Sequence, residues 1–131
     1  MKSVGLAPDE ATAGLLFTSR KGKRVAYLPA VAKLDDRLLA KIDGADLLLF
    51  DGTFWSDDEL IRVQGSGETA RQMGHIPVEE SLGLLKNVKV GRKMFVHINN
   101  TNPMLNEAGK EHRAVSKAGW EVAEDNWSIN L

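Results

Sequence analysis

Apolar runs separated by glycine, proline and charged turns divide the chain into short strands and helices. Residues 15–19 and 24–28 are rich in β-forming side chains, and the basic segment 20–23 between them contains a glycine. This pattern predicts a β-hairpin, because the glycine supplies the positive φ of a tight turn. We expect Pro29 to end the second strand and residues 1–12 to form a loose lead-in.

The segment after the hairpin has the pattern of a layered α/β fold. Apolar residues at helical spacing over 34–42 predict a helix, which Gly44 is placed to end. The run Leu47–Phe50 is apolar throughout, as is typical of a parallel strand buried on both faces. Asp51 follows it directly, at the strand end where such folds bind ligands. Alternatively, Asp51 only bonds its own turn or caps the next segment.

A long connection, residues 52–76, separates this strand from the next predicted helix at 78–85. A loop of this length is more often a binding loop or lid than a plain connector. Residues 57–63 are predicted to be helical, and the aromatic pair Phe54–Trp55 either lines a pocket or packs in a satellite core. His75 lies just before the helix start, where free backbone N–H groups favour a neutral imidazole or an anion. Its alternative role is that of a capping or surface residue.

The last third of the chain centres on a histidine in an apolar strand, His97 within Met94–Ile98. Burying an imidazole is costly unless its nitrogens are paired or bound to a metal. The Asn-rich residues 99–103 that follow have strong loop chemistry. A helix is predicted over 105–118, in which we expect His112 to be partly exposed and without a chemical role. Strands at 120–123 and 128–131 complete the prediction.

Composition places the chain among ordinary soluble domains. It has 131 residues, a formal net charge of -1 and no cysteine. We expect a single domain over residues 1–131, with no nucleic-acid partner and no association with a membrane. The absence of cysteine excludes disulfides and thiolate chemistry, and it favours a cytoplasmic location.

Three residues at predicted strand or helix ends, Asp51, His75 and His97, have side chains that suit zinc, iron or manganese. They make an incomplete metal site, because zinc takes about four ligands and no metal-binding spacing is present within one element. A metal-free acid–base site using Asp51 and His75 is the alternative. The residues alone leave both open.

Five motifs, in order along the chain, resemble one known family. They are Leu49–Trp55, Asp57–Glu59, Met73–His75, Phe95–Pro103 and Gly119–Ala123. The chain from Arg24 to Leu131 resembles the C-terminal half of the coenzyme PQQ (pyrroloquinoline quinone) biosynthesis protein B family, of the metallo-β-lactamase superfamily. The His-Ile-Asn-Asn-Thr-Asn-Pro string is the most specific part of the resemblance.

The resemblance implies a fold, an activity and a set of site residues. The implied fold is half of an αββα sandwich, with one mixed sheet and helices packed on one face. The implied activity is iron-dependent hydroxylation of the tyrosine-derived part of a peptide-derived PQQ precursor, with zinc as the alternative metal. Asp51 resembles a metal-bridging aspartate, His97 the last metal-binding histidine, and His75 a histidine that transfers protons.

The chain departs from this family in its length, because the superfamily's first metal motif lies in an N-terminal half that has no counterpart here. A truncated fragment, a separately encoded half or a homodimer that covers the open sheet face would each explain the difference. We therefore expect the active site to be incomplete in this chain alone. The alternative functions are a metal-dependent hydrolase of the same fold and a catalytically silent half-domain that binds a peptide or partner.

Overall fold

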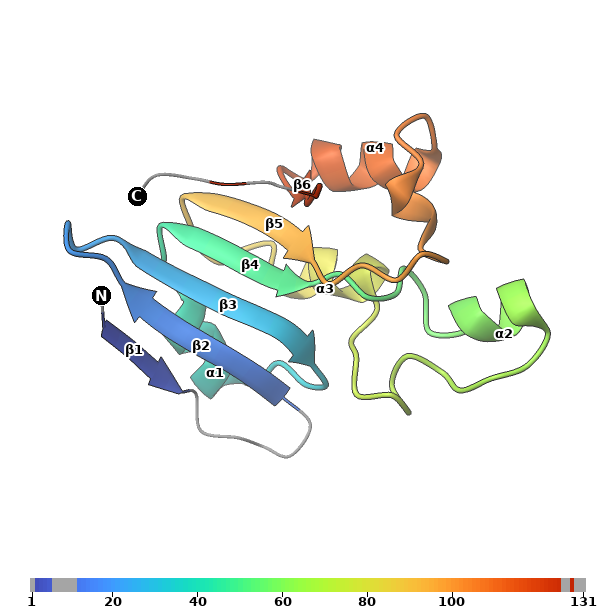
Figure 1. The fold of residues 1–131 in the computed structure, drawn as a ribbon, viewed down its shortest axis with the longest axis horizontal. Helices are drawn as coiled ribbons and strands as arrows, with labels where there is room; N and C mark the ends of the chain where they lie inside the picture. Colours follow the sequence, from blue (N-terminus) through green and yellow to red (C-terminus); the bar gives the residue numbers. More distant parts are fainter. Residues whose placement is uncertain (1, 6–11, 126–127, 129–131) are drawn as a thin grey trace.

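A computed structural model describes residues 2–5, 12–125 and 128, which form one sheet with helices beside it (Figure 1). The six strands lie in sequence order: β1 Lys2–Gly5, β2 Thr12–Thr18, β3 Arg24–Val31, β4 Leu47–Asp51, β5 Arg92–Val96 and β6 Glu121–Val122. The helical segments are α1 Asp36–Ile42, α2 Glu59–Gln64, α3 Val78–Leu84, the 3₁₀ turn η1 Pro103–Leu105 and α4 Lys110–Lys117.

The sheet is mixed. The pairs β1–β2 and β2–β3 are antiparallel, and β3, β4, β5 and β6 are parallel to one another. The predicted hairpin is confirmed, with Gly22 at a φ of 82° in its turn. The loose lead-in expected over residues 1–12 is wrong at both ends, because β1 pairs along β2 and β2 already begins at Thr12.

Pro29 does not end its strand, contrary to expectation. It lies at an irregularity where Ala13 pairs with Ala30 and Leu15 with Tyr27. Two residues of β3 therefore face one residue of β2, which is a β-bulge, and a bulge accommodates a residue that lacks an N–H. The strand continues beyond the proline to Val31, whose backbone N–H reaches the candidate site described below.

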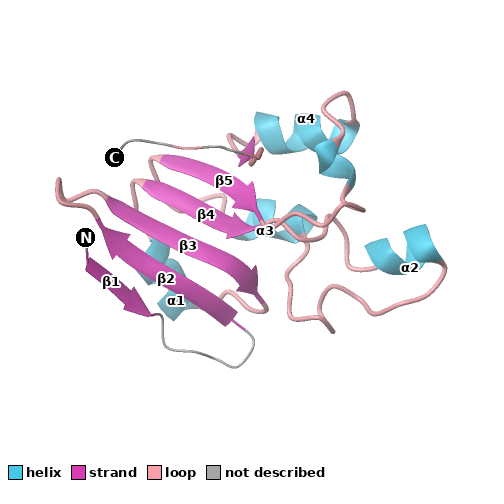
Figure 2. Ribbon diagram, in the orientation of Figure 1, coloured by secondary structure: helices cyan, strands magenta, loops and turns pink. Residues whose placement is uncertain are grey.

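The helices α1 and α3 cover one face of the sheet, behind it in the view of Figure 2. One buried cluster contains Ile42 of α1, Val78 of α3, Leu85 directly after α3, and Leu48 and Phe50 of β4. The predicted mixed sheet with helices on one face is confirmed. Because strand side chains alternate between faces, Asp51 lies on the side opposite that core.

The C-terminal part differs from the predicted single helix over 105–118. The segment is divided into η1 and α4, with a turn between them in which Gly109 N–H bonds Asn106 O at 2.9 Å. Leu105 is consequently 43% exposed, whereas Val115 is buried as the pattern predicted. The short strand β6 confirms the element expected at 120–123. Ser128 is not in a strand, and the rest of the strand expected at 128–131 lies outside the described residues.

Within the described residues, no helix has the length and apolar character needed to cross a membrane. The single domain and the cytoplasmic location stay predictions.

Candidate active site

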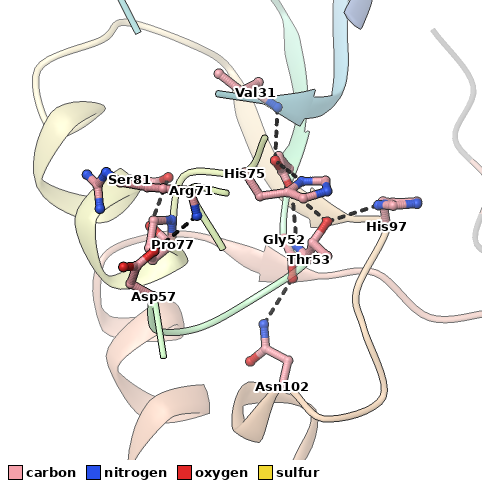
Figure 3. A network of polar contacts seen from close by, with 11 residues as sticks. Val31, Gly52, Thr53, Asp57, Arg71, His75, Pro77, Ser81, His97 and Asn102 are labelled. Carbon is pink, nitrogen blue, oxygen red and sulfur yellow. Dashed lines mark hydrogen bonds and ion pairs between the residues drawn. The ribbon is translucent and has the colours of Figure 1, made fainter. Parts of the chain in front are cut away.

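The carboxyl end of β4 places Asp51, which is fully buried, in a polar network with Val31, Thr53 and His75. Figure 3 labels these three partners. Its Oδ1 accepts hydrogen bonds from the backbone N–H of Thr53 at 3.0 Å and from the Thr53 hydroxyl at 2.7 Å. Its Oδ2 accepts a bond from the Val31 N–H at 2.9 Å. Asp51 thus bonds its own turn, as one reading of the sequence expected, and it also ties β4 to the end of β3.

His75 contacts the same carboxylate. Its Nδ1 lies 2.7 Å from Asp51 Oδ2, although the two residues are 24 positions apart in the chain. The imidazole is only 9% exposed, and the ring of Phe54 packs edge-on against it with centroids 5.8 Å apart. Because Asp51 accepts from every other neighbour, we assign the shared proton to Nδ1, which leaves the His75 Nε2 as the nitrogen available for chemistry.

Backbone hydrogen bonds hold His75 in place and also pair the free N–H groups at the start of the helix that follows it. The His75 N–H donates to Ala70 O at 2.9 Å. The N–H groups of Val78 and Glu79 donate to the carbonyls of Phe54 and Trp55, at 2.8 and 3.1 Å. The anion site expected from free N–H groups at this helix start is therefore wrong, because backbone carbonyls already occupy these donors.

His97 lies one residue beyond β5 rather than inside a buried strand, and its side chain is exposed. Its φ is 54°, and among the described non-glycine residues it alone has a positive φ. A bulky residue in this region costs about 1 kcal/mol or more and marks a site whose surroundings enforce it. The pattern of apolar residues contains no information on φ. The predicted strand therefore ran to Ile98, whereas β5 ends at Val96.

The imidazole of His97 joins the network through Thr53. The Thr53 hydroxyl lies 2.9 Å from His97 Nδ1. The rings of His75 and His97 are nearly parallel, with centroids 6.0 Å apart and 21° between their planes. The structure therefore brings together all three residues singled out from the sequence, and it adds Thr53, which the sequence-based analysis missed.

The Asn-rich loop is fastened to the turn after β4. The Asn99 N–H donates to Thr53 O at 3.0 Å, and the buried Asn102 side chain donates to Gly52 O at 2.9 Å. A Cβ on Gly52 would lie 2.8 Å from Phe95 Cβ and 3.0 Å from Val96 O. Only glycine therefore allows the turn after β4 to approach β5 this closely.

A second carboxylate, Glu59 at the start of α2, links its helix to the same loop. Its Oε1 accepts from the Trp55 N–H at 2.8 Å, and its Oε2 accepts from the Thr101 hydroxyl at 2.6 Å. Burial raises the pKa of Glu59, and the bonds from Thr101 and the Trp55 backbone lower it by less. Beside it, Trp55 lines a surface pocket of about 380 Å³ with Arg62 and Lys110, whereas Phe54 is buried.

The raised pKa of Glu59 predicts a pH-dependent stability. The folded state binds the proton more tightly than the unfolded chain, so protonation stabilises the fold and this contribution is lost as the pH rises through the folded pKa. Relative to Glu59→Gln, the wild-type chain should gain stability as the pH falls from about 7 to about 4, where the ordinary pKa of a glutamate lies. Urea unfolding of both proteins at each pH measures this change, and other carboxylates cancel in the difference. A difference that shrinks on acidification would contradict the assignment.

The donor set fits a metal centre only in part. The Asp51 carboxylate already has four hydrogen bonds with described residues, so Asp51 would have to give one up to bind a metal. His97 is exposed, and no hydrogen bond joins its Nε2 to another residue that the structure describes, which suits one ligand position. The described residues contain no group of three or more His, Cys, Asp or Glu that could hold a metal ion. The metal roles of Asp51 and His97 therefore stay predictions.

The β-lactamase superfamily domain matches residues 4–98, and the chain belongs to this superfamily. A structure of the metallo-β-lactamase fold protein YhfI from Bacillus subtilis is similar with a TM-score of 0.62 at 15% identity, over 95% of this chain and 48% of that one, which shows the fold alone.

Within the superfamily, the chain is related to coenzyme PQQ synthesis protein B, which confirms the family resemblance. It is 45% identical over 128 residues to that protein from Methylobacterium radiotolerans, covering 95% of this chain and 42% of the relative. The crystal structure of Zn²⁺-bound PqqB from Methylobacterium extorquens has a TM-score of 0.89 and 43% identity, with 95% of this chain and 42% of that chain covered. The chain thus spans less than half the length of these relatives.

Proposed function

We propose that this chain forms one wall of the active site of an enzyme of PQQ biosynthesis. The observation that carries the proposal is the buried Asp51–His75 pair, in which Oδ2 and Nδ1 are 2.7 Å apart. The ring of His97 is stacked beside that of His75. The relation to coenzyme PQQ synthesis protein B supports the pathway. For the complete protein we propose iron-dependent hydroxylation of the tyrosine-derived part of a peptide-derived precursor, with zinc as the alternative metal.

In this proposal His75 moves a proton at Nε2. The Asp51 carboxylate accepts from Nδ1, which holds the ring in one tautomer and one orientation. Phe54 limits the freedom of the ring from the side. The remaining wall of the site, including any ligands that complete a metal centre with His97, comes from protein outside the described residues or from a second copy of the chain.

A chimera tests this function. This chain is substituted for its matching segment in the Methylobacterium extorquens protein, which is 43% identical to it. Because the two segments share the fold, the chimera should restore PQQ production in a strain that lacks that protein. The purified, iron-loaded chimera should add oxygen atoms to the tyrosine-containing precursor, detected by mass spectrometry with labelled oxygen. The zinc-loaded chimera is the comparison for the choice of metal.

The outcome that would overturn the proposal is a chimera that is folded and abundant, yet makes no PQQ in the cell. Circular dichroism and thermal unfolding of the purified chimera separate this result from a failure to fold. Release of a hydrolysed product without incorporation of molecular oxygen would assign the protein to the hydrolases of this fold instead.

A further inference from the structure

The Thr53 hydroxyl is the only direct link between His97 and Asp51 among the contacts of the described residues, and its geometry fixes the direction of each bond. A hydroxyl has one hydrogen to donate. At Asp51 Oδ1, 2.7 Å away, it meets a carboxylate oxygen, which accepts. The Thr53 hydroxyl therefore donates its hydrogen to Asp51. In the contact of 2.9 Å between this hydroxyl and His97 Nδ1, the imidazole must then be the donor.

We propose that Thr53 is a positioning residue that fixes His97 in the tautomer with hydrogen on Nδ1. The Nε2 lone pair of His97 then points away from the network and is ready to bind an electrophile. The tautomer itself follows from the contacts of Thr53. The use of Nε2 at the active site rests on the proposed function.

One carboxylate thereby orients both histidines. Asp51 Oδ2 accepts directly from His75 Nδ1, and Oδ1 accepts through the Thr53 hydroxyl from His97 Nδ1. The burial of Thr53, at 6% exposure, keeps water from replacing the hydroxyl. The left-handed backbone of His97 is consistent with a ring that is held toward Thr53 at a conformational cost.

Histidine tautomers are measured by long-range ¹H–¹⁵N NMR of the labelled chain at one alkaline pH, where free imidazole is neutral. Of the three histidines in the sequence, His112 serves as an internal reference, because its Nδ1 lies 3.0 Å from the Met104 carbonyl and must donate. His75→Asn and His112→Ala assign the signals. In the wild-type chain, His97 should show a protonated Nδ1 and an unprotonated Nε2.

Two substitutions separate the hydroxyl from the bulk of Thr53. Thr53→Ser keeps the hydroxyl and should keep the His97 tautomer. Thr53→Val keeps the shape without the hydroxyl, and it should move the tautomer ratio about tenfold toward hydrogen on Nε2, the effect of one hydrogen bond. The His112 signal should not change in either variant.

A wild-type His97 with hydrogen on Nε2 would overturn the inference without any variant, so the test does not depend on the stability of Thr53→Val. An unchanged tautomer in a folded Thr53→Val chain would overturn it as well. Neither result bears on whether the chimera makes PQQ, which tests the proposed function separately.

Discussion

Asp51→Ala is expected to lower the free energy of unfolding by about 3–5 kcal/mol. The substitution leaves the Val31 N–H, the Thr53 N–H and the His75 Nδ1–H without their buried acceptor. Each unpaired buried donor costs about 1–3 kcal/mol. Because domains of this size have only about 5–15 kcal/mol of stability, the variant should be close to unfolded. Urea unfolding followed by tryptophan fluorescence measures the loss.

Asp46 provides a matched control for this loss. It lies just before β4 and accepts the Arg24 N–H at 2.8 Å, much as Asp51 at the other end of the strand accepts the Val31 N–H. The Asp46 side chain is 41% exposed, so water replaces it as a partner and Asp46→Ala should cost about 1 kcal/mol. Equal losses at the two positions would show that the buried network adds nothing to stability. Asp51→Asn should fall between them, because the amide still offers one acceptor.

Elements with a strong local pattern could be predicted from the sequence. The apolar run of β4 indicated its burial, and the helical spacing of apolar residues over 34–42 indicated α1. The same reasoning failed at Pro29, because a bulge depends on the partner strand rather than on the residue itself. It also failed at Gly109, because helical spacing predicted one helix over 105–118 and a local turn divides this segment into η1 and α4.

The site was only partly predictable for a related reason. Asp51 and His97 stand at strand ends, a position with functional meaning in any layered α/β fold. The contact between Asp51 and His75 depends on the course of the intervening loop, which no periodic pattern records. Thr53 was missed because a threonine in a turn ordinarily needs no further role. The sequence signal was present in its position, two residues after an aspartate, where a turn brings its hydroxyl back to the carboxylate.

His75→Asn in the chimera is expected to reduce PQQ production by about 10²–10⁴-fold, the usual contribution of one general acid–base group. The asparagine amide nitrogen occupies nearly the place of Nδ1, so it preserves the bond to Asp51 Oδ2 and with it most of the stability. What disappears is Nε2, the atom that moves the proton in the proposed function. PQQ released into the medium is the measurement, with the unfolding midpoint of the purified variant beside it.

His112→Ala is the control for removing an imidazole, since His112 is partly exposed on α4 and contacts only the Met104 carbonyl among the polar groups described. This variant should make PQQ at nearly the wild-type rate. The two variants together separate chemistry from folding: a role of His75 confined to packing would give an asparagine variant with normal PQQ output, because the asparagine retains the buried contact with Asp51. A proton-transfer role gives a stable and inactive protein, since no other described side chain presents an imidazole nitrogen at the position of the His75 Nε2.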